Sequence, residues 1–171
     1  MSPSRDVRLW TAPGEHDSLS RMADRAGDRE APDSTAGHGA RKPIIAVFNS
    51  SSDTVDLLRT ALESQGFQTV IGHIPEVKSG NLDLIAFIQD HGPAVIVYDI
   101  SPPYDANWTF LRLVRSAEPV KSRPFVITTT NKPALDRMVG ETDALEIIGK
   151  PYDLDQVVES VRAALARTPS G

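Results

Sequence analysis

The sequence contains no cysteine, which excludes disulfides, thiolate metal sites and cysteine nucleophiles. It has no run approaching the roughly 20 apolar residues of a membrane-spanning helix, and its first residues lack the apolar segment of a secretory signal. The net charge is only −5, so the chain has no excess of positive charge with which to hold nucleic acid. We therefore expect a cytoplasmic protein that binds neither nucleic acid nor a membrane.

Large apolar residues are scarce in the first 42 residues. Seven basic and seven acidic residues cancel there, and Gly, Pro, Ser and Ala separate them. Such a segment cannot bury enough apolar surface to offset the entropy lost on ordering. We predict that residues 1–42 form a disordered tail that is dispensable for folding. One domain should follow over residues 43–167, with a short C-terminal end at 168–171.

From Pro43 onward, short apolar runs alternate with segments whose apolar residues repeat at helical spacing. The runs that predict strands are Ile44 to Phe48, Phe67 to Ile71, Ala94 to Tyr98, Phe125 to Thr128 and Leu145 to Ile148. The segments that predict helices are Val55 to Leu62, Leu82 to Asp90, Trp108 to Ser116, Pro133 to Val139 and Leu154 to Leu165. The residues expected to face the sheet include Val55, Leu57, Leu58, Ala61 and Leu62 in the first helix, Leu82, Ile85 and Ala86 in the second, Trp108, Leu111 and Val114 in the third, and Leu154, Val157, Val158, Val161, Ala164 and Leu165 in the last. The segment Gly72 to Asn81 is interpreted as a loop. This alternation favours an α/β fold with a parallel sheet covered on both faces.

The run Ala94 to Tyr98 is apolar on both faces of its pleat, which is typical of a central strand buried on both sides. It gives way to Asp99. In open α/β sheets, ligands bind beyond the carboxyl ends of the strands, so Asp99 is placed where chemistry is usual. Taken alone, Asp99 could equally cap a turn.

Other predicted strands bring polar residues to the same edge. The fourth ends at Thr129 and Thr130, and the fifth ends at Lys150. A carboxylate, a hydroxyl and an ammonium that converge form a phosphoryl-transfer site in outline. Asp99 could act as the nucleophile, Lys150 could neutralise the transferred charge, and a threonine could bond a phosphoryl oxygen.

Three stretches carry a resemblance to a known family. They are the apolar strand into Asp99 with Pro103 four residues on, the run Pro124 to Thr129, and the run Lys150 to Leu154. In combination, residues 43–167 resemble the receiver domain of bacterial two-component response regulators.

The resemblance implies a flavodoxin-like (βα)5 three-layer sandwich with a five-stranded parallel sheet. It also implies that Asp99 is the phosphoacceptor, Thr129 the switch hydroxyl and Lys150 the family's lysine. The aromatic switch residue that the family places three positions before the lysine is replaced by Ile147.

The metal site departs from the family pattern. Family members hold Mg²⁺ with two adjacent acids at the end of the first strand, where this chain has Asn49 and Ser50. Mg²⁺ is usually held by one or two carboxylates. Asp99 is the remaining carboxylate, and its helpers would be the side-chain oxygens of Asn49 and Ser50 and the backbone carbonyl of Ser101. We therefore expect Mg²⁺ binding to be weak or lost.

The resemblance also implies partners. The phosphodonor would be a histidine kinase or a phosphotransfer protein, and the signal would pass to a downstream protein target. The family commonly uses the face of the last two helices and the fifth strand, which here should include Leu135, Val139, Ile147 and Tyr152. A second copy of the chain, in a homodimer, is a further partner to consider. We expect a single-domain receiver, because no output domain is recognised in the sequence.

Three functions compete. The first is a receiver that accepts phosphate on Asp99, which is a signalling module and not an enzyme. The second is a pseudo-receiver, an interaction module that no longer binds Mg²⁺ or is phosphorylated. The third is a phosphatase of the haloacid-dehalogenase type, which needs a second aspartate where Ser101 stands. A nucleotide enzyme is disfavoured too, because no glycine-rich phosphate loop follows the first strand.

Overall fold

The computed structural model describes residues 41–139 and 145–167. Five strands form one parallel sheet in the order β2-β1-β3-β4-β5. They are β1 (Ile44–Asn49), β2 (Gln68–His73), β3 (Val95–Ile100), β4 (Phe125–Thr129) and β5 (Leu145–Gly149). This topology confirms the predicted flavodoxin-like fold. The tail predicted over residues 1–42 falls almost wholly outside the described residues, as does the end at 168–171, so both stay predictions.

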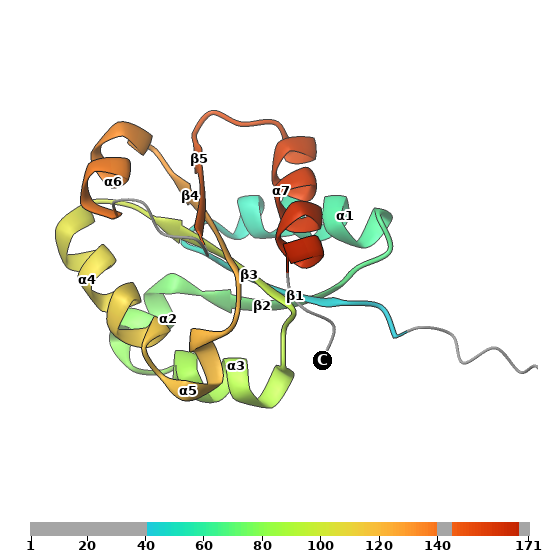
Figure 1. The fold of residues 1–171 in the computed structure, drawn as a ribbon, viewed down its shortest axis with the longest axis horizontal. Coiled ribbons are helices and arrows are strands. Elements are labelled where there is room, and N and C mark those ends of the chain that lie inside the picture. The colour runs from blue at the N-terminus through green and yellow to red at the C-terminus, as the bar shows by residue number, and fades with distance from the viewer. Residues whose placement is uncertain (1–40, 140–144, 168–171) are drawn as a thin grey trace, which may run out of the picture. The chain divides into compact units, whose positions relative to one another are not determined.

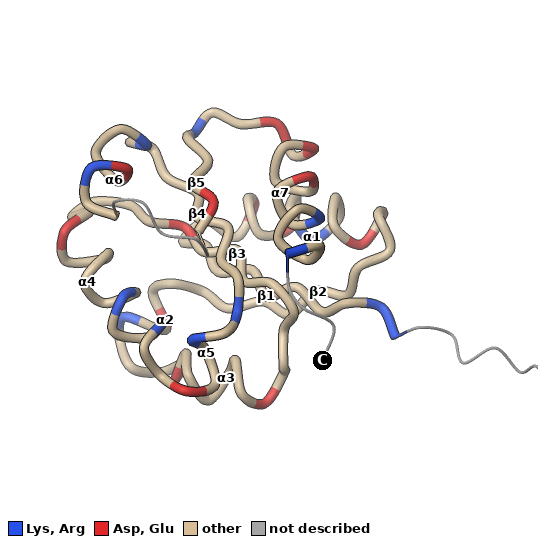
Figure 2. Tube along the Cα trace, viewed as in Figure 1, with Lys and Arg blue, Asp and Glu red and all other residues tan. Residues whose placement is uncertain are grey.

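Helices cover both faces of the sheet, so that the fold has three layers (Figure 1). One face carries α1 (Ser52–Ser64) and α7 (Leu154–Arg167). The other carries α2 (Ile74–Ser79), α3 (Leu84–His91), α4 (Tyr104–Arg115), α5 (Glu118–Lys121) and α6 (Lys132–Val139). An apolar cluster fills each interface: we call the one under α1 and α7 the α1/α7 core, and the other the α2–α6 core. Charged residues lie mostly on the helices and loops around the sheet (Figure 2).

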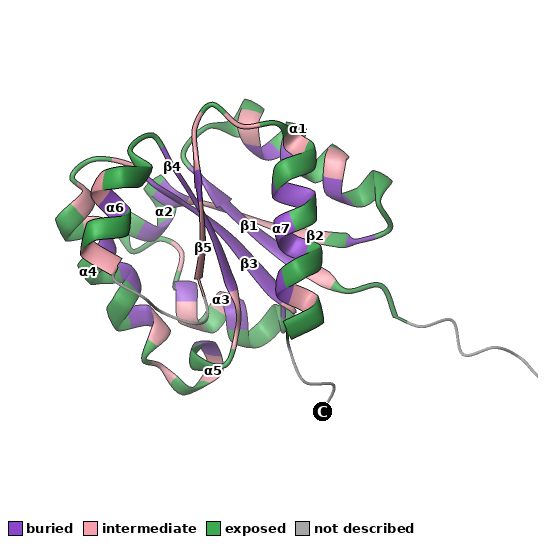
Figure 3. Ribbon diagram, turned by 45° about the horizontal axis from the view of Figure 1, so that its top comes forward, coloured by how far each residue is buried: buried purple, intermediate pink, exposed green. Residues whose placement is uncertain are grey.

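Strand β3 lies at the centre of the sheet, between β1 and β4. All six of its residues are buried, as the prediction of a central strand required (Figure 3). Each fully buried aliphatic side chain of such a strand stabilises the fold by about 1.5–3 kcal/mol. The end of β3 is therefore a firmly held position for a polar side chain.

Two short helices were not predicted. Helix α2 occupies most of the segment interpreted as a loop, and α5 follows α4 after two residues. In α2, Pro75 stands in the first turn, where its missing N–H costs nothing, and Gly80 ends the helix with a φ of 77°. Gly and Pro therefore mark the two ends of a helix here, and six residues are too few to show helical periodicity.

Some predicted faces are rotated. Asp83 caps α3 by accepting hydrogen bonds from the N–H groups of Ile85 and Ala86. The helix therefore starts later than predicted and buries Leu84 and Ile88, while Ala86 is exposed.

The inward faces of α4 and α7 are largely as predicted. The buried residues of α4 are Trp108, Leu111 and Val114, and those of α7 include Val157, Val158, Val161 and Ala164. Within residues 41–139 and 145–167, no helix has both the length and the apolar character needed to cross a membrane.

Candidate functional site

The site begins with the register between β3 and β4, which pairs Asp99 with Thr128. Side chains alternate along a strand, so residues that pair across parallel strands point to the same face. Two positions earlier, Val97 and Val126 are a pair and both lie in the α1/α7 core. Asp99 and Thr128 therefore project from the α1/α7 face, at the carboxyl edge of the sheet.

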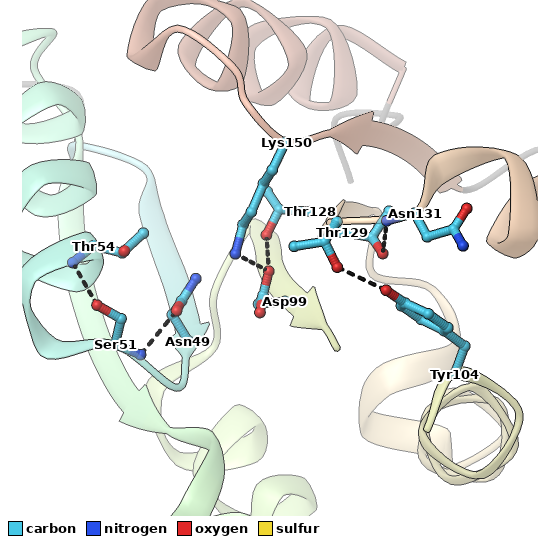
Figure 4. Close-up of polar contacts among 10 residues, drawn as sticks. Asn49, Ser51, Thr54, Asp99, Tyr104, Thr128, Thr129, Asn131 and Lys150 are labelled. Atoms are coloured by element: carbon cyan, nitrogen blue, oxygen red, sulfur yellow. Dashed lines mark hydrogen bonds and ion pairs between the residues drawn. The ribbon is translucent and has the colours of Figure 1, made fainter. Parts of the chain in front are cut away.

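One oxygen of Asp99 receives two donors (Figure 4). Lys150 Nζ lies 2.6 Å from Asp99 Oδ1, and Thr128 Oγ1 donates to the same oxygen at 2.7 Å. The side chain of Asp99 is 5% exposed and that of Lys150 is 27% exposed. A charge-assisted pair of this length, on a buried carboxylate, is stronger than one in water. The predicted convergence of Asp99 and Lys150 is present, and their chemical roles stay predictions.

The side chain of Thr129, the next residue in β4, projects from the opposite face of the sheet to the side chain of Asp99. Thr129 is completely buried, and its Oγ1 accepts a hydrogen bond from the backbone N–H of Asn131 at 3.3 Å. Thr129, which the resemblance implies as the switch hydroxyl, thus makes no hydrogen bond to Asp99 in this structure, and Thr128 does. The alternation along β4 was the signal that could have identified Thr128.

Tyr152 follows the Lys150–Pro151 junction, and its hydroxyl is buried. Burial raises the pKa of Tyr152, the charge of Asp99 raises it further, and the nearby Thr128 hydroxyl partly opposes both. The Tyr152 phenol therefore belongs to the surroundings of Asp99. Tyr98, next to Asp99 in β3, is affected more: burial, with a smaller contribution from Asp99, raises its pKa to about 12.

The four residues predicted to form a partner face do not share one. Leu135 is fully buried in the α2–α6 core, and Val139 and Ile147 pack against the same cluster. Tyr152 packs against the α1/α7 core, on the other side of the sheet. The prediction was wrong for Leu135, because that side of α6 faces the sheet.

The residues present do not fit a magnesium site. Asn49 Oδ1 already accepts a hydrogen bond from the N–H of Ser51 at 3.0 Å. The backbone carbonyl of Ser101 accepts one from Asn107 Nδ2 at 2.6 Å. Asp99 is paired with Lys150, whose ammonium lies where it neutralises the carboxylate. Nowhere in the described part of the chain do three or more His, Asp or Glu side chains gather as metal ligands do.

A hydrogen bond bridges two loops at the same edge. Tyr104, at the start of α4, lies with its hydroxyl 2.7 Å from Thr130 Oγ1, beyond β4. It joins the start of α4, which follows Asp99 in the chain, to the loop that follows β4 (Figure 4).

No family model matches the sequence. The chain is 33% identical over 131 residues to response regulator Rre1 of a Synechocystis strain. The match covers 75% of this chain and 48% of that protein, so the chain spans about half the length of the curated relative it matches.

Solved structures share the fold. A receiver protein of Sinorhizobium medicae superposes with a TM-score of 0.58 at 19% identity, over 75% of this chain and 98% of that one. The chemotaxis protein CheY4 of Vibrio cholerae gives 0.56 at 19% identity, over 72% and 99%. A structure described as a transiently phosphorylated "switch" in bacterial signal transduction gives 0.59 at 23% identity, over 75% and 98%. The chain is therefore similar in sequence to a response regulator, and it shares the fold and the sheet order β2-β1-β3-β4-β5 with receiver domains.

Proposed function

We propose that this domain accepts a phosphoryl group on Asp99 and passes the signal on by protein–protein contact. The observation that carries the proposal is the asymmetry of the Asp99 carboxylate. Oδ1 is held by Lys150 and Thr128, whereas Oδ2 has no hydrogen-bond partner among the described residues. A carboxylate with one anchored and one free oxygen is prepared to act as a nucleophile.

The transfer balances with a phosphohistidine donor from a histidine kinase or a phosphotransfer protein. A carboxylate oxygen of Asp99 attacks phosphorus, an O–P bond forms, and the P–N bond to the donor imidazole breaks. The imidazole leaves with the electron pair of that bond: it is neutral if its other nitrogen already carries a proton, and otherwise it takes a proton from solvent. Lys150 remains close enough to offset the negative charge carried by the transferred group.

The transfer, in this proposal, works with little or no Mg²⁺. Asn49 and Ser50 supply no negative charge, and both Asn49 Oδ1 and the backbone carbonyl of Ser101 already accept hydrogen bonds within the protein. Lys150 is then the main positive charge next to the acceptor. A single ammonium neutralises less charge than a divalent cation and a lysine together, so the transfer should be slow.

A second candidate, the pseudo-receiver, is favoured by the same ion pair. Asp99 is already neutralised by Lys150 without a metal or a phosphoryl group, so the fold is complete without chemistry. The two candidates differ in what Asp99 does for a downstream protein. A pseudo-receiver binds its target equally well as wild type and as Asp99→Ala, with or without a phosphodonor.

Intact-mass measurement after incubation with a small phosphodonor tests the proposal. We expect the mass of one phosphoryl group on the wild type and none on Asp99→Asn, which keeps the shape of the side chain and removes the nucleophilic charge. Lys150→Ala should label more slowly. Equal labelling of wild type and Asp99→Asn would refute the assignment of Asp99, and no labelling of either would favour the pseudo-receiver.

A further inference from the structure

The hydroxyl of Thr128 is buried, is given no role by the resemblance, and contacts the carboxylate of Asp99. Thr128 has no exposed surface, and its Oγ1 donates to Asp99 Oδ1 at 2.7 Å. We infer that Thr128 is a positioning residue, which holds Oδ1 together with Lys150 and so leaves Oδ2 to take the phosphoryl group. This inference rests on the proposed function and names the residue that prepares its acceptor.

The geometry shows how the hydroxyl acts. The two donors come from different strands, Thr128 from within β4 and Lys150 from beyond the end of β5. A single donor would leave the carboxylate free to turn about its Cβ–Cγ bond and exchange its oxygens. Two donors at one oxygen, from two directions, fix the plane of the group. Effective positioning of a reactant is a large part of catalysis in such sites.

Lys150 alone is a poorer anchor. Its side chain is 27% exposed and reaches Asp99 from a long flexible stem, whereas Thr128 is rigid and fully buried. The threonine hydroxyl has one proton, and the bond to Asp99 uses it. The buried hydroxyl of Tyr152 lies near Thr128 but has no hydrogen-bond partner, so among the described residues Lys150 and Thr128 are the two donors to Oδ1.

Thr129 provides the sharpest comparison. It is the next residue in the same strand and is equally buried, but its hydroxyl bonds the N–H of Asn131 on the other face of the sheet. Replacing each threonine by valine removes the same atom from neighbouring sites. Only at position 128 does the change remove a contact with Asp99.

The test is the rate of phosphoryl incorporation from a small phosphodonor such as acetyl phosphate, followed by intact mass over a range of donor concentrations. Thr128→Val removes a hydrogen bond to a charged group, so it should lower the maximal rate about tenfold or more. The donor concentration for half-maximal rate should change little, because Thr128 acts through Asp99 and not on the donor. Thr128→Ser keeps the hydroxyl and should recover the rate to within about threefold of wild type.

The controls separate positioning from folding. Thermal unfolding is measured for each variant, and Thr128→Ala serves if the valine methyl next to Asp99 prevents folding. Thr128→Val should label more slowly than Thr129→Val. A wild-type rate in both Thr128→Val and Thr128→Ala, failure of Thr128→Ser to recover the rate, or a larger loss in Thr129→Val would overturn the inference and leave the proposed function standing. Absence of labelling in the wild type would overturn both.

Discussion

Among the residues that the structure describes, Asp99 is the only buried side chain that carries a charge. A buried charge is tolerated when it is paired and hydrogen-bonded, and Lys150 and Thr128 provide both. The pair does not need to stabilise the fold much, since desolvation of the two charges offsets most of their attraction. Removing only one partner is different, because the other is left uncompensated.

This asymmetry predicts the outcome of a double-mutant cycle. Lys150→Met should destabilise the domain by about 2–3 kcal/mol, somewhat below the range for a fully buried pair because Lys150 is partly exposed. Combining it with Asp99→Asn should recover much of that loss, since no charge is then stranded. Urea unfolding of the four proteins measures both quantities. Additive effects of the two substitutions would contradict the coupling.

Because of Tyr98, the free energy of unfolding should decrease as the pH rises in the alkaline range. The pKa of Tyr98 is raised by burial, and less by Asp99, to about 12 in the folded protein, against about 10 when unfolded. Below pH 10 both states keep the proton. Between pH 10 and 12 only the unfolded state loses it, so the free energy of unfolding should fall by roughly 2–3 kcal/mol as pH rises.

Denaturant unfolding at pH 9, 10 and 11 measures this decline. Tyr98→Phe has no proton to lose, so its stability should fall less over the same range, with the remainder due to groups such as Tyr152, whose pKa is also raised. Parallel declines in wild type and Tyr98→Phe would show that Tyr98 is not the source.

At the scale of elements, the ring of Phe48 in β1 packs directly against the backbone of Gly72 in β2. A Cβ built on Gly72 in β2 would lie 2.2 Å from Cε1 of Phe48, a fully buried side chain of β1. Gly72→Ala should therefore destabilise the domain by about 1–3 kcal/mol through overpacking. Gln68→Ala, at an exposed position of the same strand, is the matched control and should change stability by less than about 0.5 kcal/mol. Urea unfolding distinguishes the two, and equal effects would mean that Phe48 can move aside.

The long elements could be predicted from the sequence because burial on one face is repeated in them. Val157, Val158 and Val161 of α7, and the run before Asp99, are examples. The features that could not be predicted were short helices and residues at the margin of a buried helix face. Helices α2 and α5 have too few residues to show a period, and Leu57 in α1 is 56% exposed although it neighbours the buried Leu58.

The site likewise has contacts that could be predicted from the sequence and contacts that could not. The meeting of Asp99 and Lys150 followed from parallel strand ends at one edge. The contact from Thr128 depends on a register that is specific to one residue, and a shift of one residue reverses the face. The hydrogen bond from Asn107 to the Ser101 carbonyl depends on the path of a loop, for which the sequence carries no periodic signal.

At the scale of the whole molecule, we expect the described domain to fold without the first 39 residues. The α/β alternation begins at Ile44, and the preceding residues contain few large apolar side chains. A protein that starts at Ala40 should unfold within a few degrees of the full-length chain, as measured by circular dichroism or calorimetry. A much lower unfolding temperature would mean that an N-terminal segment such as Leu9–Trp10 contributes to the core.

The proposed function requires that Lys150 and Thr128 orient Asp99 and offset its negative charge, as a bound metal does in receiver sites with an acidic pair. Three features oppose a metal at this site: Asn49 and Ser50 in place of acids, the carbonyl of Ser101 held by Asn107, and Asp99 paired with Lys150. Asn49→Asp combined with Ser50→Asp restores two carboxylates. Adding Asn107→Ala frees the carbonyl, so the triple variant should bind Mg²⁺ more tightly than the double variant.

The most direct test compares the phosphoryl incorporation rate of the wild type in Mg²⁺ with its rate in EDTA, by intact mass at one concentration of phosphodonor. We predict wild-type rates within about twofold of each other. The Asn49→Asp, Ser50→Asp variant should become tenfold or more faster in Mg²⁺ than in EDTA, since a coordinated cation is worth several kcal/mol to the transfer. A wild-type rate that collapses in EDTA and returns with Mg²⁺ would contradict the account.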